Sequence, residues 1–220
     1  MMIKLIWALA ISSSIVFYAS AGELDHSAKS NFSDNPFLAY GYNPKTKVIS
    51  GYLAAFRTAP GRTDECKLVF KGSAGHLSVK YLEETWVSEI ENDSGASITM
   101  EKNEPYLKFH RESMGGDCDW VLPFKVGKRV YATVHEVFVS VNVPVSGDWI
   151  GVYVINSERA QFHSEPDSAS LKKAYLVKGD VAYVYDEQSD WFFVRYDNKN
   201  RTTSGWIRKL DTVQPRSNGR

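Results

Sequence analysis

The sequence has no excess of charge of either sign, because 26 lysines and arginines balance 26 aspartates and glutamates. Binding to nucleic acid through phosphate contacts needs a concentrated surplus of basic side chains, and neither half of the chain holds one. A neutral chain also has little long-range attraction to a charged surface. We therefore expect no nucleic-acid partner.

The sequence also lacks the short motifs of common catalytic sites. Its five histidines stand apart from one another, and none falls into the His-Glu-x-x-His pattern. Neither a Gly-x-Ser-x-Gly turn nor a glycine-rich loop for phosphates or dinucleotides is present. Adjacent carboxylates such as Glu83 and Glu84 would point to opposite faces of a strand. Acidic residues near the cysteines do not have calcium-loop spacing. We expect no catalytic activity, cofactor or metal.

Cysteine is scarce, since the chain holds only Cys66 and Cys118. Two cysteines are too few for a multi-bridge scaffold or a cysteine-rich zinc site. In an oxidising compartment, an even pair predicts one disulfide rather than two reactive thiols. A redox pair would usually have Cys-x-x-Cys spacing, and a catalytic thiol needs a positioned histidine. We therefore predict a Cys66–Cys118 bridge.

Long apolar runs are also missing, because a bilayer span needs about 20 predominantly apolar residues. The candidate at the N-terminus has Lys4, then an apolar stretch from Leu5 to Ile11, and is then interrupted by three serines. Small residues precede Gly22, as signal peptidase cleavage requires. This pattern predicts a secretory signal over residues 1–21, and an exported, periplasmic product with no membrane span after cleavage. An uncleaved anchor is the alternative.

Apolar residues make up 43% of the chain and aromatic residues 13%, which is enough for a packed core. From Val48 onward apolar residues recur with period two, as in β-strands, and no segment resembles an amphipathic helix. In the valine-rich run 130–145, apolar residues stand at even positions before His135 and at odd positions after it. This change predicts a bulge or bend in one long strand. We predict an all-β chain with an antiparallel sandwich or barrel over residues 48–155, preceded by a loose polar arm over residues 22–47.

The last quarter of the sequence carries three linked motifs. They are the turn Gly179-Asp180, the strand Trp191-Phe192-Phe193-Val194 and the strand Gly205-Trp206-Ile207. At these separations the motifs resemble the bacterial SH3 family, and the likeness covers residues 157–213. Members of that family occur mostly on exported proteins that bind or work near the cell wall. The resemblance implies a small SH3-like β-barrel that binds rather than catalyses, followed by a polar tail over residues 214–220.

Strand periodicity assigns the side chains of this module to two faces. The resemblance places Val194 in the barrel core, and alternation then puts its neighbours along the strand on the outer face. Four aromatic side chains are expected there: Tyr183, Tyr185, Trp191 and Phe193. Of these, Tyr183, Tyr185 and Phe193 predict an outward patch, and such a patch marks an interface. Docking against the first domain is the simpler interpretation, and an external ligand is the alternative.

Two charged loops of the first domain would meet if the disulfide forms. One loop holds Arg57 and Arg62 on either side of a Pro-Gly turn, and the other holds Asp117 and Trp120 beside the second cysteine. Two glycine-containing loops stapled together would make a preorganised recognition surface. A solvated pair of turns with no specific role is the simpler alternative.

These patterns favour an exported, non-catalytic binding protein that uses its SH3-like module to engage a cell-wall component or an envelope protein. The alternative is a periplasmic inhibitor or immunity-type protein that blocks a partner enzyme through the loops of its first domain. An envelope hydrolase targeted by the module is disfavoured, because the motifs of such an enzyme are missing.

Overall fold

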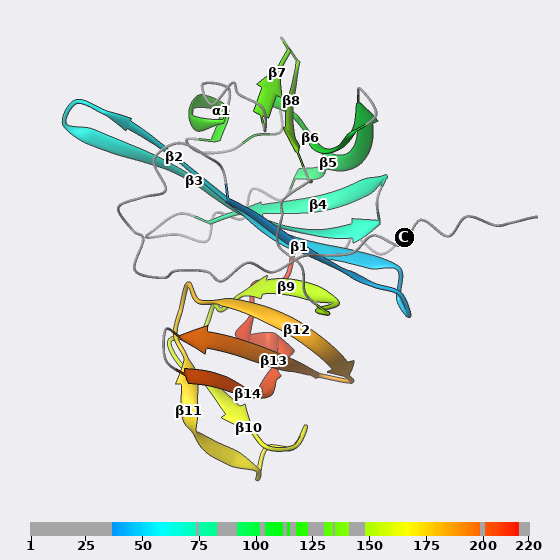
Figure 1. The fold of residues 1–220 in the computed structure, drawn as a ribbon, viewed down its shortest axis with the longest axis vertical. Helices are drawn as coiled ribbons and strands as arrows, with labels where there is room; N and C mark the ends of the chain where they lie inside the picture. Colours follow the sequence, from blue (N-terminus) through cyan, green and yellow to red (C-terminus); the bar gives the residue numbers. More distant parts are fainter. Residues whose placement is uncertain are drawn as a thin grey trace, which may run out of the picture.

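The computed structural model describes residues 37–73, 75–82, 92–101, 104–111, 114, 118–122, 130–133, 135–140, 148–198 and 201–215. Within these residues the chain is almost entirely β-strand and forms two antiparallel sheets (Figure 1). The predicted all-β class is therefore confirmed. The predicted secretory signal lies outside the described residues.

In the described residues the first sheet is a meander of eight strands. They are β1 (Phe37–Asn43), β2 (Val48–Ala59), β3 (Arg62–Ser73), β4 (His76–Tyr81), β5 (Asn92–Glu101), β6 (Glu104–His110), β7 (Val130–Ala132) and β8 (Glu136–Ser140). Neighbours in sequence pair in space, except that β6 pairs with β8 and leaves β7 at the edge. The predicted Pro60-Gly61 turn joins β2 to β3, and Gly61 has a φ of 82°, which glycine adopts without strain.

One face of the first sheet holds the larger core. Alternate residues of β3, namely Cys66, Leu68 and Phe70, are buried in it, as a period-two strand requires. The short helix α1 (Cys118–Val121) adds Val121 to this core. The predicted Cys66–Cys118 disulfide is present and ties α1 to β3. Linking residues that are 52 positions apart stabilises the fold by about 4 kcal/mol in the chain-entropy model.

The second sheet has six strands in the described part of the chain, in the spatial order β11-β10-β14-β13-β12-β9. They are β9 (Gly151–Val154), β10 (Ala160–His163), β11 (Leu171–Leu176), β12 (Val181–Gln188), β13 (Trp191–Asn198) and β14 (Arg201–Arg208). Val194 points into a separate core, as the resemblance implied, and Val184 and Phe192 belong to the same core. After the 3₁₀-helix η2 (Lys209–Asp211), the chain returns to β9, where the Val213 N–H donates to the Val154 carbonyl (2.8 Å).

Three expectations about the first domain are corrected. Residues 37–43 form β1 rather than part of a loose arm, because they pair with β2 along their whole length. Strand β9, predicted to end the first domain, pairs with β12 and so belongs to the second sheet. In place of one bent strand near His135, β7 and β8 form a hairpin in which the Thr133 N–H donates to the Glu136 carbonyl (2.8 Å). Residues 141–147 lie outside the described residues. The alternation of apolar and polar residues identifies strands but does not show which strands pair with each other, and this explains the errors.

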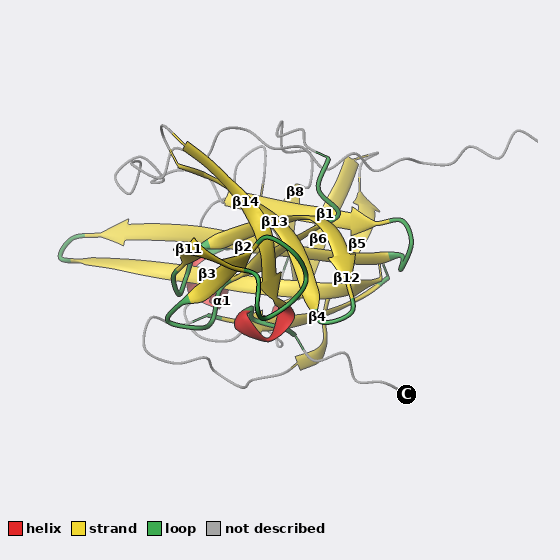
Figure 2. Ribbon diagram, turned by 90° about the horizontal axis from the view of Figure 1, so that it is seen from below, coloured by secondary structure: helices red, strands yellow, loops and turns green. Residues whose placement is uncertain are grey.

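The two sheets pack directly against each other. Figure 2 shows the strands of the second sheet running steeply across β2 and β3. Trp149 is buried against Ala39 of β1, and its Nε1–H donates to the Tyr40 carbonyl (2.8 Å). The backbones approach closely because two glycines meet, since a Cβ on Gly41 would lie only 2.4 Å from the Gly151 nitrogen. The second sheet is thus fixed to the first by an aromatic, closely packed contact.

Candidate functional site

The predicted aromatic patch is divided between two surfaces. Tyr183 and Tyr185 pack with Trp149 and Tyr52 in the contact between the sheets. The ring centroids of Tyr183 and Trp149 are 4.5 Å apart. Burial in this apolar contact raises the pKa of Tyr183 well above its usual value. These two tyrosines therefore dock the second sheet against the first, as the simpler interpretation of the patch expects.

A β-bulge separates Phe193 from the interface tyrosines. Val184 lies opposite Val194, but the next pair joins Asp186 to Phe193, so Tyr185 is the extra residue of β12. Phe193 is not part of the cluster in which Tyr183 and Tyr185 pack between the sheets, and its ring instead contacts that of Trp206. The alternation along the strand gave the correct face for Phe193, but the bulge changes which residues of β12 lie beside it.

Trp191 and Phe193 lie on the outer face of β13, beside side chains of β10 and β14. We call this group the Trp191 surface: Trp191, Phe193, His163, Trp206 and Arg208. Strand register assembles it, because Phe193 lies opposite Trp206, and Trp191 lies opposite Arg208. The ring centroids of Trp191 and His163 are 4.7 Å apart and those of Phe193 and Trp206 are 5.4 Å apart, both edge to face. Trp191 and Phe193 remain partly exposed.

The Trp191 surface also carries polar groups. His163 is buried, with 4% of the residue exposed, and its Nδ1 has no hydrogen-bond partner in the described part of the chain. Arg208 lies over the Trp191 ring, with 5.6 Å between the guanidinium carbon and the ring centre, and donates to the Ser168 hydroxyl (2.9 Å). Aromatic rings beside an imidazole and a guanidinium can stack on an apolar or flat group and hydrogen-bond its edges.

The second predicted site lies beside the disulfide, where β2, β3 and α1 meet. We call it the Trp120 surface: Arg57, Arg62, Asp64 and Trp120. The Arg57 guanidinium carbon lies 3.8 Å from the Trp120 ring centre, and the Trp120 Nε1–H donates to the Asp64 carboxylate (3.2 Å). Arg62 pairs with the same carboxylate (2.6 Å), which is buried, whereas 43% of Trp120 is exposed. Three predicted residues thus come together, and Asp117 lies outside the described residues.

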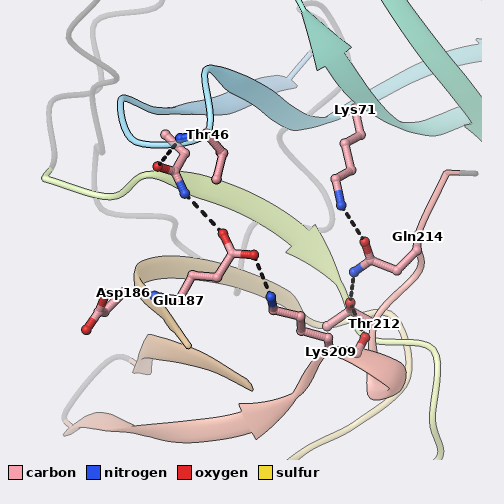
Figure 3. A network of polar contacts seen from close by, with 8 residues as sticks. Thr46, Lys71, Asp186, Glu187, Lys209, Thr212 and Gln214 are labelled. Atoms are coloured by element: carbon pink, nitrogen blue, oxygen red, sulfur yellow. Dashed lines mark hydrogen bonds and ion pairs between the residues drawn. The ribbon is translucent and has the colours of Figure 1, made fainter. Parts of the chain in front are cut away.

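A polar network between the sheets has no counterpart in the sequence-based prediction (Figure 3). Glu187 of β12 accepts hydrogen bonds from Asn43 Nδ2 of β1 (3.0 Å) and from Lys209 Nζ of η2 (2.5 Å). The bulge at Tyr185 reverses the alternation of β12, so that Glu187 lies opposite Phe192 rather than on the outer face. Alternation continued through β12 without this bulge would place Glu187 on the outer face.

A cavity of about 80 Å³ lies beside this network, lined in part by Ser50, Lys71 and Tyr153. Burial lowers the pKa of Lys71, and its ammonium donates to Gln214 Oε1 (3.0 Å). Burial also raises the pKa of Tyr153 to about 12. The cavity is well below the roughly 300 Å³ of small ligand pockets. We therefore assign the network and its cavity to the contact between the sheets.

Comparison of the chain with models of protein families, with curated proteins and with solved structures finds no match. Among the described residues, no three histidine, cysteine, aspartate or glutamate side chains gather into a metal-binding group. None of the helices in the same part of the chain is long and apolar enough to cross a bilayer. Function must therefore be inferred from the two candidate surfaces.

Proposed function

We propose that the chain is an exported, non-catalytic binding protein that uses its second sheet as a bacterial SH3-like module to engage a cell-wall component or an envelope protein. The observation that carries this proposal is the Trp191 surface. Its side chains Trp191 and Phe193 stay partly exposed, whereas Tyr183 and Tyr185 are used in docking. Aromatic groups beside arginine are the usual anchors of binding surfaces.

The motifs behind the SH3 resemblance support this role. Gly179, in the expected turn before β12, has a φ of 90°, a conformation that favours glycine. The Gly-Trp-Ile motif divides between the two faces, because Ile207 is fully buried in the core and Trp206 belongs to the Trp191 surface. The disulfide supports export, since such bonds persist mainly in oxidising compartments.

The proposal is tested by co-sedimentation of the purified protein with purified cell-wall material. Trp191→Ala should weaken binding at least tenfold, because truncating an anchoring aromatic side chain costs about 2 kcal/mol or more. Trp120→Ala is the matched control, since it removes the same type of side chain from the first domain and should bind normally. Circular dichroism checks that both variants fold. Equal binding by wild type and Trp191→Ala, or release of fragments from the cell-wall material, would contradict the proposal.

The Trp120 surface favours a second candidate function, a periplasmic inhibitor that blocks a partner enzyme. The Arg57 guanidinium and the Asp64 carboxylate hold the exposed Trp120 in one orientation, which lowers the entropy lost on binding. The test is capture of one protein from periplasmic extract in stoichiometric amount. This function predicts that Arg57→Ala and Arg62→Ala abolish capture and that Trp191→Ala does not. The opposite pattern would reject it.

A further inference from the structure

An apolar stripe lies on β11, the terminal strand of the second sheet. Five large hydrophobic side chains are exposed in the described part of the chain, and three of them lie on this strand or directly after it. They are Leu171 (64% exposed), Tyr175 (47%) and Val177 (44%). Leu171 and Tyr175 lie opposite His163 and Gln161 of β10 and so share one face, whereas Leu176 points into the core. Grouped apolar side chains of this kind mark an interaction surface.

The same strand has a backbone edge that is unpaired in the described residues. β11 pairs with β10 alone, and Figure 1 places it at the end of the second sheet farthest from the first. The Gln161 side chain donates to the carbonyls of Lys172 and Ala174, which therefore point toward β10. The register between β10 and β11 shifts between Tyr175 and Leu171, but the Lys172 and Ala174 carbonyls on either side of Lys173 both point toward β10. Because successive residues of a strand direct their backbone groups to opposite edges, those of Lys173 and Tyr175 then point away from the sheet.

Basic side chains surround the stripe. The Arg159 guanidinium carbon lies 4.0 Å from the Tyr175 ring centre. Lys173 is exposed on the same face as the stripe. Lys178 lies 3.9 Å, nitrogen to oxygen, from Glu158, and both side chains are largely exposed. The surface is therefore complementary to a partner that carries carboxylates.

We propose that β11 accepts an extended acidic peptide segment as an additional strand of the second sheet. The backbone groups of Lys173 and Tyr175 bond the added strand, the stripe packs against its apolar side chains, and Arg159 pairs with its carboxylates. A lipid surface would cover the apolar and basic side chains but leave the backbone edge without partners, which favours a polypeptide. Lysines along the edge also disfavour pairing with a second copy of this chain.

The test is an NMR titration of the ¹⁵N-labelled full chain with the synthetic peptide Val-Thr-Glu-Thr-Val-Thr-Glu-Thr, which places valine and glutamate on one face of a strand. We expect saturable binding, with hydrogen exchange of the Lys173 and Tyr175 amides slowed at least tenfold. The Lys172 amide already points toward β10 and should change little. A peptide with lysine in place of glutamate is the charge control and should bind at least tenfold more weakly.

Two surface variants complete the test. The double variant Leu171→Lys, Tyr175→Lys removes the stripe at exposed positions and should reduce affinity at least tenfold. Leu210→Lys is the matched control, because Leu210 is 71% exposed and lies on η2. The proposal fails if the peptide shows no saturable binding at millimolar concentration, if both peptides bind equally, or if binding leaves the two edge amides unprotected. Binding to vesicles of anionic lipid without binding to the peptide would also overturn it.

Discussion

The two sheets hold their surface tryptophans by different means. Trp120 stands on a single helical turn that a disulfide ties to β3, and it is held between Arg57 and Asp64. Trp191 stands on a regular strand above a hydrophobic core, and its neighbours are set by strand register. The first surface thus depends on a covalent bond and a buried carboxylate, and the second depends on packing. The two surfaces should therefore fail under different perturbations, which makes them separable by experiment.

The largest effect is expected from loss of the contact between the sheets. Trp149→Ala removes a buried indole that packs on Tyr183 and bonds the Tyr40 carbonyl. The free energy of unfolding should fall by about 3–5 kcal/mol, measured by urea denaturation. Hydrogen exchange should show that β9 and β12 lose protection while β3 and β4 keep it. Equal loss of protection in both sheets would show that they form one cooperative unit.

Removal of the disulfide should destabilise the first sheet and the Trp120 surface. The variant Cys66→Ala, Cys118→Ala should lose up to about 4 kcal/mol of stability, because the unfolded chain regains the freedom that the bridge removed. Hydrogen exchange should increase in α1, and the Trp120 surface should lose binding to any partner. Protection of β12 to β14 is the internal control. If these strands also lost protection, the two surfaces would not be independent.

The smallest effect is alkaline weakening of the second sheet. Burial raises the pKa of Tyr153 from 10.0 to about 12, so the folded state disfavours the tyrosinate. The contribution of this pKa shift to the free energy of unfolding is fully present below pH 10 and is lost as the pH rises toward 12. About 1 kcal/mol of it is lost by pH 11. The raised pKa of Tyr183 acts in the same direction, and the lowered pKa of Lys71 acts in the opposite direction. Urea midpoints at pH 9 and 11 measure the net change, and Tyr153→Phe should reduce the drop. A drop of the same size in that variant would exclude Tyr153 as its source.

Local alternation predicted the strands β12, β13 and β14, because each has one buried face. The SH3 resemblance implied that Val194 points inward, and alternation from Val194 then gives the same direction for Phe192. It failed for β1, where Leu38 packs into the first core and Ala39 into the contact between the sheets. A strand buried on both faces has no alternation to detect. Strand partners depend on contacts between distant residues, which the pattern of one segment does not contain.

The candidate surfaces were also only partly predictable, because they too depend on contacts between distant residues. The cysteines bring Arg57 and Trp120 together because a disulfide is a distant contact that can be inferred from composition. The burial of Asp64 could not be inferred, because it depends on the position of α1. The hydrogen bond between Glu187 and Asn43 could not be inferred either, because the bulge at Tyr185 decides to which face the Glu187 side chain points. One extra residue in a strand changes the face of every residue after it.

The first strand of the second sheet, β9, and the segment after η2 lie side by side. Ile155 faces Thr212 in an antiparallel bridge, and the Val213 N–H donates to the Val154 carbonyl. Because these segments run antiparallel, the chain leaves the pair in both directions at the same end. A force that pulls residues 150 and 215 apart therefore opens these bonds one after another, as in a zipper, rather than loading them together in shear. We expect this closing contact to open under low force, whatever the thermodynamic stability of the sheet.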